Sequence, residues 1–130
     1  MPIVIMIVDD SRIMRSTVKG VFSAIASSCK FVEAQDGEEA LALLETETIN
    51  LILLDWNMPK LSGIDFLKQV RAIDKYKDIP IIMVTSEAAK FNVIEALKNG
   101  ATDYITKPIN LDLFKSKLAK LNLFRTKTWN

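Results

Sequence analysis

Carboxylate, hydroxyl and ammonium side chains follow directly after short apolar runs in this chain. They are Asp9 and Asp10 after Ile3 to Val8, Asp55 after Leu51 to Leu54, Thr85 after Ile81 to Val84, and Lys107 just beyond Tyr104 and Ile105. Because ligand sites of open parallel sheets lie outside the carboxyl ends of the strands, we expect these groups to converge on one sheet edge. Three acids, one hydroxyl and one ammonium would then share a single crevice.

The three acids define the chemistry of such a crevice. Two carboxylates about 4 Å apart repel by roughly 4 kcal/mol at an effective dielectric near 20, so three together need a cation or raised pKa values. Oxygen ligands without nearby His or Cys favour a hard ion, Mg²⁺ or Mn²⁺. Asp55 could then attack phosphorus as a nucleophile, while Mg²⁺ and Lys107 neutralise phosphoryl oxygens and Thr85 donates a hydrogen bond.

The elements that must position these groups alternate along the chain. Short apolar runs predict five strands, at Ile3 to Val8, Phe31 to Ala34, Leu51 to Leu54, Ile81 to Val84 and Tyr104 to Ile105. Strands that are apolar throughout are buried on both faces, which indicates a parallel sheet covered by helices on each side. The predicted fold is therefore α/β, a doubly wound (βα)₅ sheet of five parallel strands.

Helical periodicity separates the strands. One stripe comprises Met14, Val18, Val21, Phe22 and Ile25, and the last comprises Leu111, Phe114, Leu118 and Leu121, with further helices at 37–45, 63–73 and 88–98. Ser62 to Asp65 resembles a capping box, and Gly100 stands where a C-terminal glycine belongs. Gly20 lies inside the first helix, and we interpret it as a position of close packing.

Composition excludes several classes of function. The chain has 130 residues, 17 Lys plus Arg against 16 Asp plus Glu, and no His. This balance predicts no nucleic-acid binding, and the absence of His excludes Ser-His-Asp catalysis and an internal phosphohistidine. The first apolar run is too short to insert into a membrane, so we expect a cytoplasmic protein. Cys29 is interpreted as a half-buried residue without a role.

Four segments, taken together, resemble the motifs of response-regulator receiver domains, most of all those of the chemotaxis type. They are Val8-Asp9-Asp10-Ser11, Leu53 to Pro59, Met83 to Ala88 and Tyr104 to Pro108. The likeness spans about residues 3 to 124 and implies a flavodoxin-like fold with strand order 2-1-3-4-5. We expect residues 1–124 to form the receiver domain and residues 125–130, with Trp129, a short tail.

The resemblance also implies roles for individual residues. Asp55 would be the phosphoacceptor, with Lys107 and Thr85 contacting the phosphoryl group and Thr85 and Tyr104 moving as a switch. The metal ligands would be Asp10, Asp55 and the Asn57 backbone carbonyl, with Asp9 acting through a water. The Lys107-Pro108 bond would be cis, and the polar Asn57 and Glu87 would favour rapid self-dephosphorylation.

Each residue also has a purely structural interpretation. Asp9 or Asp10 could cap the first helix, Thr85 or Ser86 could cap the fourth, and Lys107 could be a solvated charge. Tyr104 could be packing on an outer strand, and Trp56 a partner contact or a loop residue. Only the joint pattern favours the functional interpretation, because these readings leave the three acids crowded together without a reason.

The partners follow from the receiver hypothesis. A separate histidine kinase would donate the phosphoryl group, and a protein target, such as the flagellar motor switch, would read the conformation of an expected monomer, with a phosphatase as a further partner. A phosphorelay shuttle or a receiver cut from a larger regulator remains an alternative. A small Mg²⁺-dependent phosphatase is disfavoured because Asn57 stands where such enzymes place a second acid. An FMN carrier is disfavoured because Asp9 and Asp10 would repel its phosphate.

Overall fold

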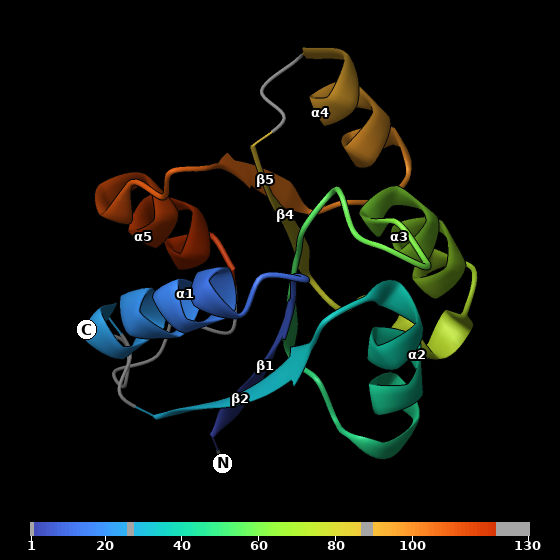
Figure 1. Cartoon of the computed structure of the whole chain (residues 1–130), viewed down its shortest axis with the longest axis horizontal. Helices are drawn as coiled ribbons and strands as arrows, with labels where there is room; N and C mark the ends of the chain where they lie inside the picture. Colours follow the sequence, from blue (N-terminus) through green and yellow to red (C-terminus); the bar gives the residue numbers. More distant parts are fainter. Residues whose placement is uncertain (1, 26–27, 87–89, 122–130) are drawn as a thin grey trace.

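The chain folds around one sheet of five parallel strands, as Figure 1 shows. The computed structural model describes residues 2–25, 28–86 and 90–121. The strands are β1 (Ile3–Val8), β2 (Cys29–Ala34), β3 (Leu51–Leu54), β4 (Ile81–Thr85) and β5 (Asp103–Thr106). Their order across the sheet is β2-β1-β3-β4-β5, and every neighbouring pair is parallel. The predicted (βα)₅ fold and strand order are confirmed.

Helices cover both faces of the sheet. They are α1 (Arg12–Ile25), α2 (Gly37–Thr46), α3 (Gly63–Arg71), α4 (Lys90–Lys98) and α5 (Leu111–Ala119), with a short 3₁₀ helix at Asp74–Tyr76. In Figure 1, α1 and α5 lie together on one side, and α2, α3 and α4 on the other. Two separate apolar cores result, one beneath each layer of helices.

The sheet is buried most deeply where the candidate site begins. All residues of β3 and of β4 are buried, as is the second half of β1. Beneath α1 and α5, the ring of Phe22 meets that of Phe114 edge to face, with centroids 5.2 Å apart. Aromatic pairs in this arrangement contribute about 0.5–1.5 kcal/mol beyond their buried area. The strands that Asp9 and Asp55 follow are therefore held in place by a closely packed core.

The predicted helix ends are present. Ser62 caps α3 by accepting a hydrogen bond from the Asp65 amide, and its hydroxyl lies 3.1 Å from the Asp65 carboxylate. Gly100 adopts a positive φ of 100° after α4. The Gly100 amide bonds to the Leu97 carbonyl and the Ala101 amide to the Ala96 carbonyl, which is the hydrogen-bond pattern of a Schellman C-cap.

Three expectations from the sequence were wrong in detail. Gly20 is not closely packed, because a Cβ atom there would meet nothing within 4 Å. Helix α3 ends at Arg71 instead of Ile73, where the chain turns to extended dihedrals and enters the 3₁₀ helix. Leu111, the first residue of α5, is 46% exposed, so it does not share the buried stripe of Phe114 and Leu118.

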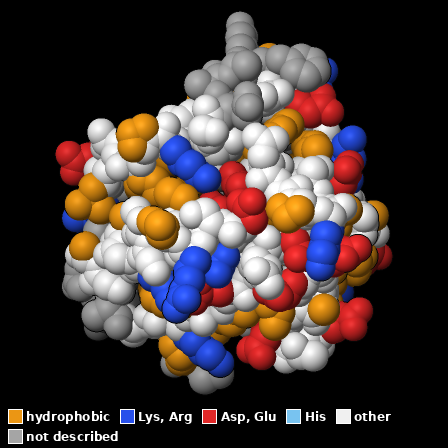
Figure 2. Space-filling model, in the orientation of Figure 1, with side chains coloured by type: hydrophobic (Ala, Val, Ile, Leu, Met, Phe, Trp, Pro, Cys, Tyr) orange, Lys and Arg blue, Asp and Glu red, His pale blue; other side chains and the backbone are white. Residues whose placement is uncertain are grey.

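Some sequence assignments fall on residues that the structure does not describe. They are Glu87, Ala88, the side chain of Ile25, and the tail 125–130 with Trp129, which all lie outside the described part. Within the described part, no helix is long and apolar enough to cross a membrane. Lys and Arg side chains are interspersed with Asp and Glu over the face shown in Figure 2.

Candidate phosphoacceptor and metal site

Lys107 lies between two of the predicted acids. Its ammonium nitrogen is 3.1 Å from Oδ2 of Asp9 and 3.2 Å from Oδ1 of Asp55. The Lys107 side chain is only 19% exposed, so these contacts are partly shielded from water. The three residues follow β1, β3 and β5, and they meet because parallel strands end at the same edge of the sheet. Lys107 is therefore not the solvated charge of the structural interpretation.

Asp10 completes an acidic cluster with Asp9 and Asp55. One carboxylate oxygen of each residue lies within 4.8 Å of the others, with Asp9 and Asp55 buried and Asp10 exposed. The donor set contains oxygen alone, and one acid opens to solvent. Hard divalent cations that retain several waters, such as Mg²⁺, prefer this combination. The residues present thus fit a Mg²⁺ or Mn²⁺ ion.

The pKa values of the cluster reflect this crowding. Burial raises the pKa of Asp55, and the charge of Asp9 raises it further, while Lys107 partly opposes both effects. Burial lowers the pKa of Lys107, but its hydrogen bond to Asp9 and the charge of Asp55 outweigh that effect and leave the pKa raised. Lys107 therefore stays charged at neutral pH, while ionised Asp55 is held at a cost to the fold.

The turn after β1 is built around Asp9. Its carboxylate accepts a hydrogen bond from the Ser11 amide at 2.8 Å, and its own amide donates to the Ala34 carbonyl at 3.0 Å. The cap of α1 is Ser11, whose hydroxyl accepts from the Met14 amide at 3.2 Å. Neither Asp9 nor Asp10 makes that contact, so helix capping does not account for the two acids.

The loop after β3 brings the start of α3 back against the end of β3. The Gly63 amide donates to the Trp56 carbonyl at 3.0 Å, and a Cβ atom on Gly63 would lie 2.1 Å from the Asp55 carbonyl oxygen. Only glycine permits so close an approach between α3 and the phosphoacceptor candidate. Within this loop Asn57 is exposed, Lys60 has a positive φ of 67°, and Trp56 packs half-buried against the core.

Thr85 and Tyr104 lie on two neighbouring strands, Thr85 at the end of β4 and Tyr104 on the edge strand β5. Thr85 is the last residue of β4, is 3% exposed, and its carbonyl accepts a hydrogen bond from the Lys107 amide at 2.9 Å. Tyr104 is half-buried on β5, with the Lys117 ammonium 4.1 Å from the centre of its ring. Lys117 also bonds to the Asp103 carboxylate at 3.0 Å and to the Tyr104 carbonyl. Lys117 could not be identified from the sequence, because only the tertiary fold brings it over Tyr104.

Known proteins match this chain over nearly its whole length. The family model described as response regulator receiver domain matches residues 5–119. This chain belongs to the response-regulator receiver family. A chemotaxis protein CheY homolog of Campylobacter jejuni is 43% identical over 115 residues, which cover 88% of both chains. The chemotaxis protein CheY of Pseudomonas aeruginosa is 38% identical over 117 residues, covering 90% of this chain and 94% of the relative.

Solved receiver structures agree with the fold. Chemotaxis protein CheY4 of Vibrio cholerae superimposes with a TM-score of 0.82 at 33% identity, over 93% of this chain and all of that one. The Mn²⁺-bound form of the response regulator Rcp1 superimposes with a TM-score of 0.80 at 30% identity, over 99% of each chain. The receiver domain is thus a two-component signalling module and not an enzyme that turns over an external substrate.

Site details that depend on the peptide backbone also agree with expectation. The Lys107-Pro108 bond is cis, as the resemblance implied.

Cys29 lies in β2, away from the site residues in the sequence, and is half-buried. Burial raises the pKa of its thiol, so the reactive thiolate form is disfavoured, in agreement with the absence of a role expected from the sequence.

Proposed function

We propose that this receiver domain accepts a phosphoryl group on Asp55 and reports it by a change of conformation. One observation carries the proposal: Lys107 bridges Asp9 and Asp55 at 3.1 and 3.2 Å within a cluster of three acids. A buried carboxylate beside an ammonium is suited to attack an electrophile with charged oxygens, provided that the two further acids hold a cation which offsets their repulsion of those oxygens.

Asp55 supplies the nucleophile. An oxygen of its ionised carboxylate forms a bond to phosphorus, and the bond from phosphorus to the donor's imidazole nitrogen breaks, so that the imidazole leaves with the bonding electron pair. The product is an acyl phosphate on Asp55, close to the Lys107 ammonium that now lies beside Asp55. These 130 residues contain no His, so the donor's phosphohistidine lies elsewhere, and in the receiver family it belongs to a histidine kinase.

The cation would be held by the carboxylates of Asp10 and Asp55 and by the Asn57 backbone carbonyl, with Asp9 acting through a water. Asp10 is the exposed member of the cluster and Asp55 a buried one, so the ion would lie at the rim of the crevice. When bound, Mg²⁺ supplies charge neutralisation at the phosphoryl oxygens. Mn²⁺ suits the same oxygens, and the solved structure of Rcp1 is a Mn²⁺-bound form.

Thr85 and Tyr104 would transmit the change. Thr85 lies at the end of β4, beside the strand that carries Asp55, and Tyr104 lies on the next strand outward. A phosphoryl group on Asp55 would draw in Lys107 and the Thr85 hydroxyl, and Tyr104 would follow toward the space behind Thr85. The conformation that binds the target then becomes the favoured one, as a population shift.

The relatives named chemotaxis protein CheY favour a role in chemotaxis. The target would then be a component of the flagellar motor switch, which would read the conformation of a monomeric cytoplasmic domain. A phosphatase could accelerate the self-dephosphorylation of this domain. A phosphorelay shuttle would use the same site. Capture of targets by phosphorylated and unphosphorylated protein separates these two roles.

Incubation with acetyl phosphate and Mg²⁺, followed by intact mass, tests the proposed function. Wild type should gain one phosphoryl group, and Asp55→Asn should gain none, because an amide is a poor nucleophile. Asp65→Asn, at an exposed acid in the first turn of α3, is the control and should label as wild type does. Stoichiometric labelling of Asp55→Asn at another residue would exclude this assignment.

Titration of Trp fluorescence with Mg²⁺ tests the cation site. Asp10→Asn should bind Mg²⁺ at least about tenfold more weakly, because a charged ligand of a hard ion is lost. Trp56, next to Asp55, provides the signal. An affinity equal to that of wild type would show that Asp10 is not a ligand.

A further inference from the structure

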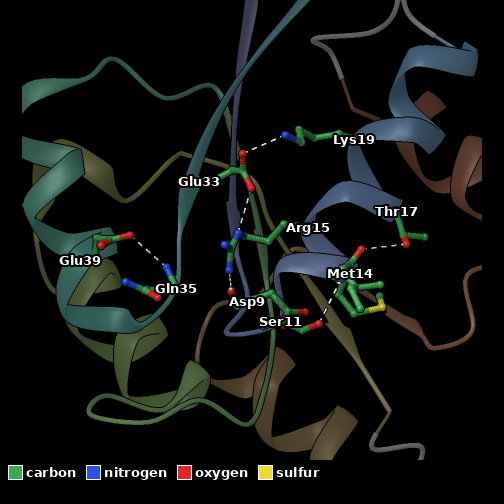
Figure 3. A network of polar contacts seen from close by, with 10 residues as sticks. Asp9, Ser11, Met14, Arg15, Thr17, Lys19, Glu33, Gln35 and Glu39 are labelled. Atoms are coloured by element: carbon green, nitrogen blue, oxygen red, sulfur yellow. Dashed lines mark hydrogen bonds and ion pairs between the residues drawn. The ribbon is translucent and has the colours of Figure 1, made fainter.

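Arg15 reaches from the first helix to the turn that carries the acidic pair. Figure 3 shows its guanidinium between Glu33 and Asp9. Nη1 donates to the Asp9 backbone carbonyl at 2.6 Å, and Nε donates to the Glu33 carboxylate at 2.9 Å. Three elements, β1, α1 and β2, are joined through this one side chain, which is 14% exposed.

Glu33 is itself fixed on its far side. Its second carboxylate oxygen lies 2.9 Å from the ammonium of Lys19, one helical turn beyond Arg15. The hydrogen bond from Lys19, followed by that from Arg15, lowers the pKa of Glu33, so its carboxylate stays charged at neutral pH. The planar guanidinium thus bonds to Glu33 through Nε and to the Asp9 carbonyl through Nη1. Lys has a single ammonium group and cannot reproduce this two-point geometry.

The Asp9 carbonyl belongs to the peptide unit that begins Asp10. Orienting this carbonyl orients the whole rigid peptide plane, and with it the direction in which the Asp10 backbone starts. Asp10 is exposed, so packing does little to fix the position of its carboxylate. Asp9 is fixed separately, through its amide to Ala34 and its carboxylate to Ser11 and Lys107.

We propose that Arg15 is a positioning residue for the cation site, which holds the Asp9-Asp10 peptide so that the Asp10 carboxylate faces Asp55. This inference rests on the proposed function, since it concerns the same Mg²⁺ site. Arg15 touches neither the cation nor the phosphoryl group, and it acts through the backbone of the two acids.

The sign of the effect separates positioning from electrostatics. Removing a positive charge near three acids should tighten the binding of a cation, because one repulsive charge disappears. Removing a group that orients a metal ligand should weaken the binding of the cation. Residues that hydrogen-bond to metal ligands without touching the metal typically contribute about 10–100-fold in affinity. Weaker Mg²⁺ binding by Arg15→Ala therefore cannot arise from the charge change.

The experiment is a Mg²⁺ titration of Trp56 fluorescence in a Trp129→Phe background, with thermal unfolding of each variant to show that it is folded at the titration temperature. Arg15→Ala should bind Mg²⁺ about tenfold more weakly. Lys19→Ala is the matched control: it removes a positive charge and the other ion pair to Glu33 but leaves the Asp9 carbonyl bonded. It should bind as wild type does or slightly more tightly.

Arg15→Lys is the second variant, for use if Arg15→Ala does not fold. It keeps the positive charge but can make only one of the two hydrogen bonds of Arg15. We expect it to bind Mg²⁺ several-fold more weakly as well. Wild-type affinity in either Arg15 variant, or equal weakening by Lys19→Ala, would overturn the inference. If wild type itself binds no Mg²⁺ and takes no label from acetyl phosphate, the proposed function fails instead, so the two failures are distinguishable.

Discussion

Replacing Asp55 by Asn should stabilise the fold when divalent cations are absent. Asp55 is 8% exposed and shares its crevice with Asp9 and Asp10. The raised pKa of Asp55 means that the folded state favours its neutral form, mainly because burial penalises the charge. Asn has nearly the same shape and carries no charge, so the variant keeps the packing and loses the penalty.

The expected gain is a difference between opposing terms. At an effective dielectric near 20, losing the Lys107 contact at 3.2 Å costs about 5 kcal/mol of attraction. Losing the repulsion from Asp9 within 4.8 Å returns about 3.5 kcal/mol, and the exposed Asp10 returns a smaller, screened amount. These Coulomb terms nearly cancel, and the relieved burial of a charge leaves a net gain of about 1–2 kcal/mol.

The gain depends on pH in a defined direction. Below about pH 4, the ordinary pKa of Asp in an unfolded chain, Asp55 is protonated in both states and the charge carries no penalty. Between that pKa and the raised pKa of folded Asp55, the unfolded state ionises while the folded state stays protonated, so wild type loses stability as pH rises. The advantage of Asp55→Asn should therefore be absent at pH 3 and should grow from pH 3 to pH 7.

Urea unfolding followed by circular dichroism, in EDTA at pH 3, 5 and 7, measures this advantage. Asp36→Asn is the control, because Asp36 is a buried acid that caps α2 and Asn caps equally well, so its unfolding free energy should hardly change. With Mg²⁺ at about 100 times its Kd, wild type should gain about 2.7 kcal/mol and overtake Asp55→Asn. If Asp55→Asn is less stable than wild type in EDTA at pH 7, the electrostatic reasoning about the cluster is wrong.

Four further variants have expected outcomes. Gly63→Ala should lower the unfolding free energy by about 3 kcal/mol in the urea assay, because its Cβ would lie 2.1 Å from the Asp55 carbonyl oxygen. Gly20→Ala should raise the unfolding free energy by up to about 1 kcal/mol in the same assay, because its Cβ would meet nothing within 4 Å and Ala favours a helix over Gly. Lys117→Met should lower it by about 1 kcal/mol through loss of the cation over Tyr104, and should sharpen the Tyr104 ring resonances in NMR spectra as the ring moves faster. Asn57→Met should slow the decay of phosphorylated protein after donor removal, because an apolar side chain two places after Asp55 hinders the attacking water; decay at the wild-type rate would contradict this.

Elements that depend on local patterns could be predicted from the sequence. Strands β1 and β3 have the predicted bounds, because each is a continuous apolar run that an acid ends. The cap of α3 was predicted because Ser62 and Asp65 interact within one turn. Strand β2 begins two residues earlier than predicted, since Cys29 and Lys30 pair with β1 although their side chains give no strand signal.

The acids of the site were found for the same reason, as each ends an apolar run. Their mutual contacts could not be predicted, because Lys107 and Asp9 are 98 positions apart. Arg15 gave no signal either: on an amphipathic helix it resembles any solvated charge, and only the packing of α1 beside β2 brings it to Glu33. Such residues are defined by what the folded chain places opposite them.

The division of the core into two halves has a consequence for local unfolding. Asp9 leads into α1 and Lys107 lies before α5, above one core, whereas Asp55 lies before α3, above the other. A cation at the acids, or a phosphoryl group on Asp55 beside Lys107, would add a further link between layers that otherwise share the sheet and the Lys107–Asp55 contact, so both layers should open before it is released. In native-state hydrogen exchange, amides of α1 and of α3 should therefore open with separate free energies in EDTA and with one common free energy once the site is filled.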